Sequence, residues 1–191
     1  MKIVLASNSP RRKELLERLE VSFSVEGSNI DEVVREGEAP TQVAMGLALQ
    51  KALDIAENHG DDTLIIAADT IVFDQVIMGK PKSEEDAKHM LHQLNGKVHE
   101  VITGIAIVQA GTLNKIAAYE RTMVKFKQVT TEKIDRYVAS GEPFGKAGSY
   151  AIQGKGMTLV EWIQGDYNNV VGLPVGLLED LLERHFGLFF L

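Results

Sequence analysis

The chain is organised around its beginning, which reads Ile3-Val4-Leu5-Ala6-Ser7-Asn8-Ser9-Pro10-Arg11-Arg12-Lys13-Glu14-Leu15-Leu16. The apolar start of this stretch, together with the preceding Lys2, predicts a strand over Lys2–Ala6. The pattern of residues 10–19 predicts a helix. Pro10 suits the first helical position, because proline lacks the N–H that would have no helical partner there, and Ser9 is then the N-cap. The stretch therefore predicts a strand, a short polar turn and a helix.

Three consecutive cations, Arg11, Arg12 and Lys13, fall in the first turn of this predicted helix. The helix macrodipole favours negative charge at that end, so a local rule is broken, and such breaks tend to mark functional sites. A bound anion would resolve the conflict, because backbone N–H groups at a helix start and arginine side chains both hold anions. We interpret the stretch as a phosphate site. On this stretch alone, three solvated surface charges remain an equal alternative.

The bulk composition limits the classes of function. A chain of 191 residues fits one domain, residues 1–191, and 45% hydrophobic with 25% charged residues is ordinary for a globular protein. The net charge of −7 argues against a general nucleic-acid surface and favours a small anionic ligand at a local basic site. The absence of cysteine excludes disulfides, thiolate metal sites and cysteine nucleophiles.

No apolar run approaches membrane-spanning length, and no signal peptide precedes the first predicted strand. We therefore expect no membrane partner and a cytoplasmic location. None of the five histidines falls in a metal-ligand spacing.

A second informative stretch is the near-continuous apolar run of residues 63–73, which predicts a strand buried on both faces. Asp69 and Thr70 interrupt it, although aspartate is depleted in strands and a buried carboxylate is costly unless it is paired or metal-bound. A carboxylate held there could coordinate Mg²⁺ or accept a proton from water. The alternative is an Asp–Thr pair that closes the strand and satisfies a turn.

Two lysines near this run carry little information by themselves. Lys51 lies within the helix predicted at residues 41–58, and a lysine on a helix is most often surface charge. Lys80 belongs to Gly79-Lys80-Pro81, which is not a P-loop, because no glycine stands five residues before Gly79. Residues 26–40, which include Glu32, predict an acidic loop.

The third informative stretch, residues 141–156, contains five glycines, which mark sharp turns or close backbone approach. Gln153 supplies a planar amide that can both donate and accept, and such an amide can read the edge of a base. A loop-capping glutamine is the alternative, and without further context it is favoured.

The remaining pattern completes the predicted elements. These are strands at 21–25, 76–78, 98–109, 113–127 and 158–163, and helices at 83–94, 130–140 and 175–185, with a polar turn at 165–169. The apolar tail, residues 186–191, either packs on its own body or fills a partner's groove.

Taken together and in this order, these stretches resemble the Maf family of nucleotide pyrophosphatases over essentially the whole chain. The motifs that carry the resemblance run in one register: Leu5–Leu16, Ala68-Asp69-Thr70, Gly79-Lys80-Pro81, Lys146-Ala147-Gly148-Ser149-Tyr150-Ala151-Ile152-Gln153-Gly154, Gly165-Asp166-Tyr167 and Val171-Gly172-Leu173-Pro174.

The resemblance implies an α/β fold like that of inosine triphosphate pyrophosphatases. Such a fold has a long curved mixed β-sheet flanked by helices, and two lobes with a central cleft for a nucleotide. It also implies hydrolysis of a nucleoside triphosphate to the monophosphate and pyrophosphate with a divalent cation, Mg²⁺ or Mn²⁺. The Ser-Pro-Arg-Arg and Ile-Gln-Gly segments are similar to those of the branch that acts on dTTP and UTP.

Residue roles follow from the resemblance position by position. Asp69 matches the active-site acid and a metal ligand, and Glu32 matches a second metal ligand. The positions associated with base selection are Arg12, Thr70 and Gln153. Those that match phosphate-contacting or cleft residues are Ser7, Arg11, Lys51 and Lys80. The chain departs from the family pattern at Gly145, where relatives often carry an acid.

Two other functions stay open. One is a non-enzymatic, nucleotide-responsive regulator of septum formation, in which the apolar tail contacts a division protein. The other keeps the enzyme class but moves the substrate to purine or modified nucleotides. If the chain is the dTTP/UTP enzyme, we further expect that it clears modified pyrimidine nucleotides, is linked to cell division arrest and forms a homodimer.

Overall fold

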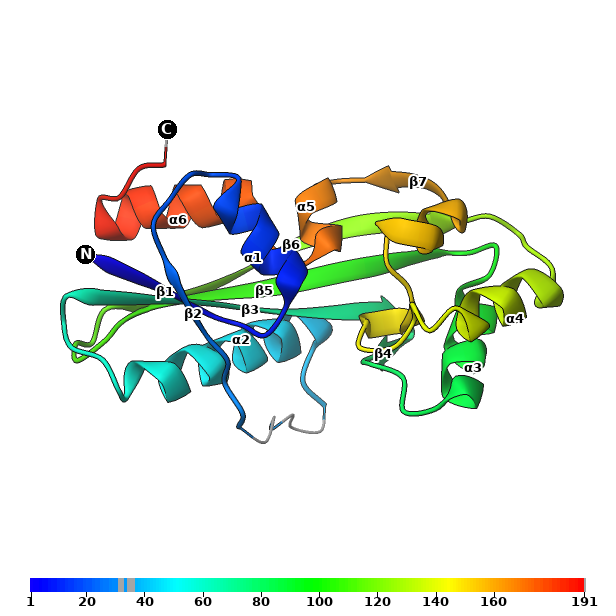
Figure 1. Ribbon diagram of the computed structural model, residues 1–191, viewed down its shortest axis with the longest axis horizontal. Helices are drawn as coiled ribbons and strands as arrows, with labels where there is room; N and C mark the ends of the chain where they lie inside the picture. Colours follow the sequence, from blue (N-terminus) through cyan, green and yellow to red (C-terminus); the bar gives the residue numbers. More distant parts are fainter. Residues whose placement is uncertain (31–32, 34–36, 191) are drawn as a thin grey trace. The chain divides into compact units, whose positions relative to one another are not determined.

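The structure, a computed structural model, describes residues 1–30, 33 and 37–190 (Figure 1). The described chain forms two compact units. The first comprises Met1–Asp69, Thr103–Glu120 and Gly172–Leu191, and the second comprises Thr70–Ile102 and Arg121–Val171. The prediction of a single domain stays a prediction.

Strands and helices alternate along much of the chain. The strands are β1 (Lys2–Ala6), β2 (Ser24–Glu26), β3 (Thr63–Asp74), β4 (Val76–Met78), β5 (Val98–Gln109), β6 (Lys115–Phe126) and β7 (Val160–Gln164). The α-helices are α1 (Pro10–Glu17), α2 (Pro40–Ala56), α3 (Glu84–Leu94), α4 (Thr131–Ala139), α5 (Tyr167–Val171) and α6 (Val175–Phe186), and the 3₁₀ helices are η1 (Ala147–Ser149) and η2 (Gly154–Thr158).

The strands form a mixed sheet in the order β2-β1-β3-β5-β6-β7, with β4 paired to β3. β1 runs parallel to both β2 and β3, whereas the β3–β4 and β6–β7 pairs are antiparallel. The predicted mixed sheet with flanking helices is therefore confirmed.

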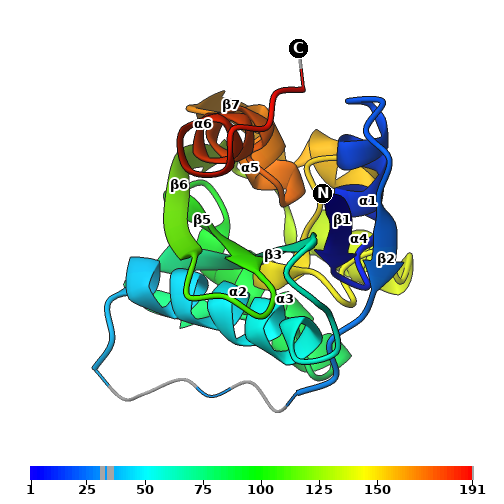
Figure 2. The ribbon, with the colours of Figure 1, turned by 90° about the vertical axis from the view of Figure 1, so that its left-hand side faces the viewer.

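In the first unit, small side chains of α2 pack against β1 and β3. Ala48 and Ala52 share a buried cluster with Ala6, Ile65 and Ala67. Helices α2 and α6 lie on opposite faces of this part of the sheet (Figures 1 and 2).

Close packing of α2 against β5 depends on Gly104. A Cβ added there would lie 2.2 Å from the backbone oxygen of Ala44. Glycine is required because any side chain at this position would push the helix away from the strand.

The second unit has its own core, in which α3 and α4 pack on β5 and β6 around the fully buried Phe126. Tyr150 and His99 contact this ring edge-on, with ring centroids 4.7 and 4.9 Å from that of Phe126. The hydroxyl of Tyr150 lies 2.8 Å from Nε2 of His99, so the imidazole has a polar partner inside an apolar core.

Besides the strand predicted at 21–25, which lies at Ser24–Glu26, two segments differ from the predictions. The polar turn predicted at 165–169 in fact leads into helix α5. The Asp166 carboxylate accepts the Asn168 N–H at 2.7 Å, and Asn169 is fully buried in the short helix that follows. The second difference is the strand predicted from residue 158, which starts at Val160 because η2 extends to Thr158.

The C-terminal segment of the described chain follows helix α6. Gly187, with φ of +63°, ends α6, and beyond it Leu188 and Phe190 are partly buried while Phe189 is exposed. Among the described helices, none is long and apolar enough to cross a bilayer.

Candidate functional site

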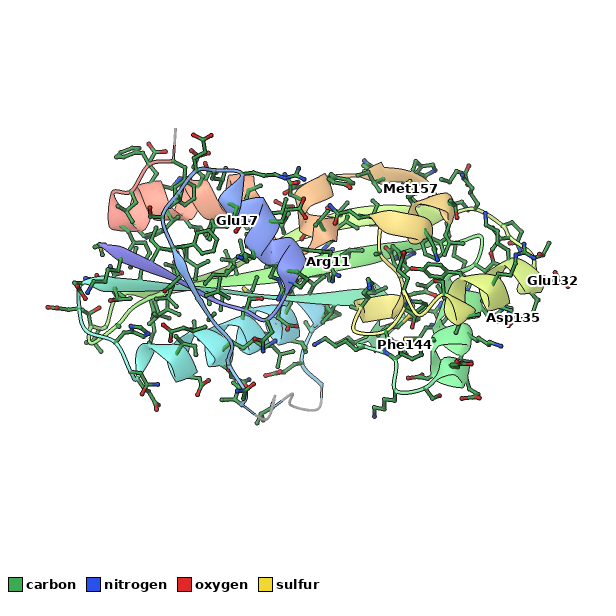
Figure 3. The ribbon with its side chains drawn as sticks, in the orientation of Figure 1. Arg11, Glu17, Glu132, Asp135, Phe144 and Met157 are labelled. Atoms are coloured by element: carbon green, nitrogen blue, oxygen red, sulfur yellow. The ribbon has the colours of Figure 1, made fainter. Side chains whose placement is uncertain are left out.

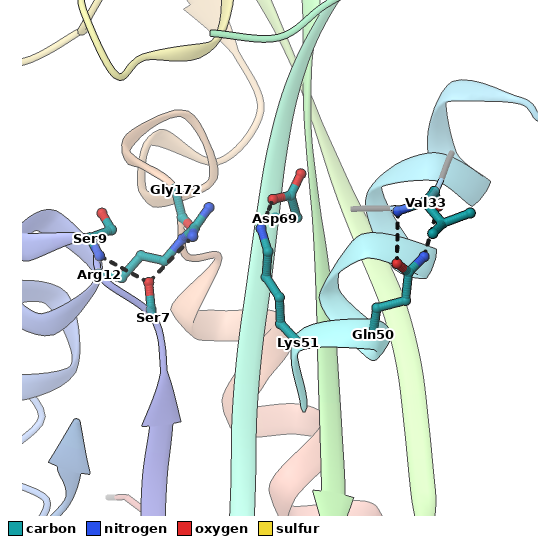
Figure 4. Close-up of polar contacts among 8 residues, drawn as sticks. All are labelled: Ser7, Ser9, Arg12, Val33, Gln50, Lys51, Asp69 and Gly172. Carbon is teal, nitrogen blue, oxygen red and sulfur yellow. Dashed lines mark hydrogen bonds and ion pairs between the residues drawn. The ribbon is translucent and has the colours of Figure 1, made fainter. Parts of the chain in front are cut away.

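Asp69 meets Lys51 inside the first unit (Figure 4). Asp69 lies two residues after Ala67, so its side chain is on the same face of β3 as Ile65 and Ala67, the face that α2 covers. Lys51 lies three residues after Ala48 and four before Ile55, which places it on the apolar stripe of α2. The Lys51 ammonium therefore reaches the strand and donates a hydrogen bond to Oδ1 of Asp69.

Both charged side chains of this ion pair are largely buried, at 14% exposed each. An unpaired carboxylate at such a position would carry a large desolvation penalty, which the ammonium offsets. Lys51 is thus not surface charge, as lysines on helices usually are. Its spacing of three and four residues from Ala48 and Ile55 is the one sequence signal that could have indicated this location.

A second group of contacts surrounds Arg12 in the same unit (Figure 4). Its Nε donates to the backbone oxygen of Gly172 at 2.7 Å, and its Nη1 donates to the hydroxyl of Ser7 at 3.4 Å. The Ser7 hydroxyl also accepts the N–H of Ser9 at 3.1 Å. Ser7 is buried. Through these two hydrogen bonds its hydroxyl connects the end of β1 to the start of α1.

The three cations of the first turn have different surroundings. Arg11, which Figure 3 labels at the start of α1, and the next residue Arg12 are both partly buried. Lys13 is exposed and pairs with Glu17 at 3.3 Å. Of the three, Lys13 alone is an exposed surface charge, and the phosphate site stays a prediction. Ser9 is the N-cap and Pro10 the first helical residue, as predicted, but the Ser9 side chain makes no capping hydrogen bond.

Both groups lie near the carboxyl end of β1. In the parallel β1–β3 pair, Ala6 is aligned with Ala67; Ser7 follows Ala6, and Asp69 is two residues beyond Ala67. The chain goes from β1 through α1 to β2 on one side, and returns through α2 to β3 on the other. In α/β sheets, ligands bind outside the carboxyl ends of strands where the direction of winding reverses in this way.

The remaining predicted residues belong to the second unit. Thr70 is its first residue, on β3, and Lys80 is exposed after β4. The N–H of Gly148 donates to the backbone oxygen of Gly79 at 3.1 Å. This bond brings the Gly79-Lys80-Pro81 motif and the glycine-rich motif together.

Gln153 stands at the N-cap position of η2, where its side chain forms no capping bond. The loop-capping alternative is therefore wrong for this helix. The side chain is partly buried, and no hydrogen bond of its amide to the described residues is found.

Sequence reasoning missed three residues that hold these groups in place. Gly172 supplies a backbone oxygen to Arg12, although Val171-Gly172-Leu173-Pro174 was noted as a motif. Glu142 and Tyr137 bind the loop that carries Gln153. No spacing rule connects these two side chains to that loop.

Metal ligands are sparse in the described part of the chain. No group of three or more histidine, aspartate and glutamate side chains there could hold a metal ion. Asp69 is a described carboxylate, and Glu32 lies outside the described residues.

Residues 2–185 match the family described as Maf-like protein. The chain belongs to the Maf family. A Maf relative from Bacillus cereus named dTTP/UTP pyrophosphatase is 52% identical over 184 residues, which is 96% of this chain and 95% of the relative. Another with the same name, from Alkaliphilus metalliredigens, is 47% identical over 97% of this chain and 96% of the relative. A solved HAM1 protein from Coxiella burnetii matches 66% of this chain and 73% of its own at 14% identity and a TM-score of 0.48.

Proposed function

We propose that the chain hydrolyses dTTP and UTP to the nucleoside monophosphate and pyrophosphate. The observation that carries the proposal is the 52% identity, over 96% of the chain, to a relative named dTTP/UTP pyrophosphatase. The Ser-Pro-Arg-Arg and Ile-Gln-Gly segments support the pyrimidine substrates.

The first unit supplies groups for the triphosphate. The first turn of α1 contains Arg11 and Arg12, and Ser7 lies just before it. Helix N-termini and arginine side chains both bind phosphate oxygens. Lys51 adds an ammonium next to Asp69. In the second unit, the exposed Lys80 is assigned to phosphate as well. Catalysis of phosphoryl transfer consists largely of such positioning and charge stabilisation.

Asp69 is the proposed general base. Its carboxylate accepts a proton from the attacking water while the water oxygen bonds to the α-phosphorus. The bond from that phosphorus to the bridging oxygen of the β-phosphate breaks, and pyrophosphate leaves. Lys51 holds Oδ1 of Asp69 in place on the sheet, which fixes the carboxylate for this role.

The donor set is compatible with a magnesium or manganese ion. Mg²⁺ is usually bound through one or two carboxylates together with substrate phosphates, and Asp69 provides one carboxylate, with Glu32 proposed as the second. When bound, such an ion lowers the pKa of a coordinated water and neutralises phosphate charge.

Base selection is assigned to Gln153, with Arg12 and Thr70 in support. The amide offers one acceptor and two donor hydrogens, which complement the N3–H and the carbonyl oxygens of uracil and thymine. A base with the opposite pattern leaves polar groups unpaired, so discrimination can be large.

A nucleotide panel tests this proposal. Purified protein is incubated with Mg²⁺ and each of dTTP, UTP, dCTP, dATP, dGTP and a base-modified pyrimidine triphosphate, and the monophosphate and pyrophosphate products are quantified. We expect the highest kcat/KM with dTTP and UTP. Preference for a purine would support the alternative substrate class. Binding without turnover would support the regulator of septum formation. A homodimer, a link to cell division arrest and an apolar tail that contacts a partner stay predictions.

A further inference from the structure

The carboxylate of Glu142 organises the loop that carries Gln153. Its Oε1 accepts the N–H of Gly156 at 2.8 Å, and its Oε2 accepts the N–H of Lys155 at 2.9 Å. These donors lie two and three residues after Gln153. The backbone on the C-terminal side of Gln153 is thus bound by both oxygens of one side chain.

Tyr137 extends the same anchor to the other side of Gln153. The Tyr137 hydroxyl donates to Oε1 of Glu142 at 3.0 Å and accepts the N–H of Ala151 at 3.2 Å. Ala151 lies two residues before Gln153. The segment 151–156 is therefore bound on both sides of the glutamine to a single carboxylate, once directly and once through a hydroxyl.

Two glycines allow the loop to approach this anchor closely. Gly154 has φ of +72°, and a Cβ there would lie 2.7 Å from Oε2 of Glu142. A Cβ at Gly156 would lie 2.2 Å from the Ala151 oxygen and 2.7 Å from the Tyr137 hydroxyl. The glycine spacing of the motif is thus explained by the contact with Glu142 and Tyr137.

The carboxylate is held in its charged form. Burial by itself raises the pKa of Glu142, but hydrogen bonds from the N–H groups of Lys155 and Gly156 and from Tyr137 outweigh it, so the pKa lies below its ordinary value. Charge-assisted bonds of this kind are stronger than neutral ones. The bonds from the loop to Glu142 are therefore charge-assisted.

We propose that Glu142 is a positioning residue for base selection, which fixes the 151–156 loop so that the Gln153 amide faces the pyrimidine edge. This inference rests on the proposed function. It differs from a purely structural role, because it requires that loss of the carboxylate changes nucleotide preference through Gln153.

The principal variant is Glu142→Gln, which keeps the side-chain size but replaces one acceptor oxygen with a donor NH₂ group. We expect the kcat/KM ratio of dTTP to dCTP to fall about tenfold, because a small misplacement of a binding group is costly. Activity on dCTP is expected to change little. Glu161→Gln, on the exposed part of β7, is the matched control and should retain the wild-type ratio.

A double variant separates the two roles. If Glu142 acts through Gln153, then Glu142→Gln added to Gln153→Ala leaves the ratio at the value of Gln153→Ala alone. A ratio that falls by the product of the two single effects overturns the inference. So does an unchanged ratio in a folded Glu142→Gln protein.

Tyr137→Phe provides a second variant if Glu142→Gln does not fold. It removes the hydroxyl that joins Ala151 to Glu142 but keeps the ring, and it should lower the ratio less than Glu142→Gln does. Amide hydrogen exchange without nucleotide should show loss of protection at Ala151 in Tyr137→Phe. Unchanged protection and an unchanged ratio in this variant overturn the inference. Wild-type protein that hydrolyses no nucleotide would instead refute the proposed function itself, and the inference with it.

Discussion

Lys51 of helix α2 donates a hydrogen bond to Asp69, at the position where the apolar run of strand β3 is interrupted. The two residues are 18 positions apart and belong to different elements, yet both side chains are only 14% exposed. The pair unites the proposed general base with a cation suited to a phosphate. Substitution of Asp69 and substitution of Lys51 are expected to have different effects, the first on activity and the second on stability.

Asp69→Asn should abolish hydrolysis and leave the protein folded. The amide has nearly the shape of the carboxylate but cannot accept a proton from water, and loss of a general base typically costs about a hundredfold to ten-thousandfold in rate. Product formation from dTTP and circular dichroism are the measurements. Asp61→Asn, at an exposed position, is the control. Near-normal turnover by Asp69→Asn would rule out Asp69 as the base.

Lys51→Met should lower the free energy of unfolding by about 1–3 kcal/mol, because it leaves the partly buried Asp69 carboxylate without its cation. Urea unfolding at neutral pH measures this change. Adding Asp69→Asn should restore much of the lost stability, since no uncompensated charge then remains. Lys2→Met, which breaks the exposed pair with Asp62, is the control and should have little effect. Equal effects of the two lysine changes would contradict the assigned role of burial.

Gln153→Ala should weaken the preference for dTTP and UTP more than it lowers general activity. The reason is that a truncated side chain loses base-specific hydrogen bonds without touching the groups assigned to phosphate. The measurement is kcat/KM over the nucleotide panel. Gln164→Ala, at an exposed position of β7, is the control. A panel that is identical in Gln153→Ala and wild type would refute base selection by this amide.

His99 should make stability depend on pH. Burial lowers the pKa of His99 from 6.5 to about 4, with Asp74 opposing the shift. The unfolded chain therefore binds a proton between about pH 6.5 and pH 4 that the folded chain does not bind. Stability should fall as the pH falls through this window, by up to about 3 kcal/mol in total. In urea unfolding at pH 7 and pH 5, His99→Gln should show a smaller difference than wild type; an equal difference would contradict the prediction.

Much of the fold was predictable because the spacing of hydrophobic residues and the positions of turn residues determine strands and helices from local sequence alone. The strands Lys2–Ala6, Val76–Met78 and Val98–Gln109 have the predicted bounds. The helix predicted at 83–94 is α3, which Ser83 caps by accepting the N–H of Asp86. Helix α5 was missed because the polar sequence at its start is typical of a turn. The helix start depends on one hydrogen bond, which the backbone N–H of Asn168 donates to the carboxylate of Asp166. Local propensity does not report such a bond.

The candidate site was predictable in its residue types but not in its supports. An aspartate within an apolar strand requires a partner, yet nothing near it in the sequence identifies that partner as Lys51. Arg12 binds the backbone oxygen of Gly172, 160 residues away, and any residue could have supplied that carbonyl. The hold of Glu142 on the loop depends likewise on the path of the backbone, which sequence patterns do not specify.

Gly104 affects the proposed active site through the packing of helix α2. It sets how closely α2 lies on the sheet at Ala44, and Lys51 is two turns further along the same helix, about 10 Å away. A bulkier residue there would lift the helix and draw the ammonium off the carboxylate. An inactive natural or engineered variant could therefore carry every proposed chemical group intact and differ from an active enzyme by a single methyl group.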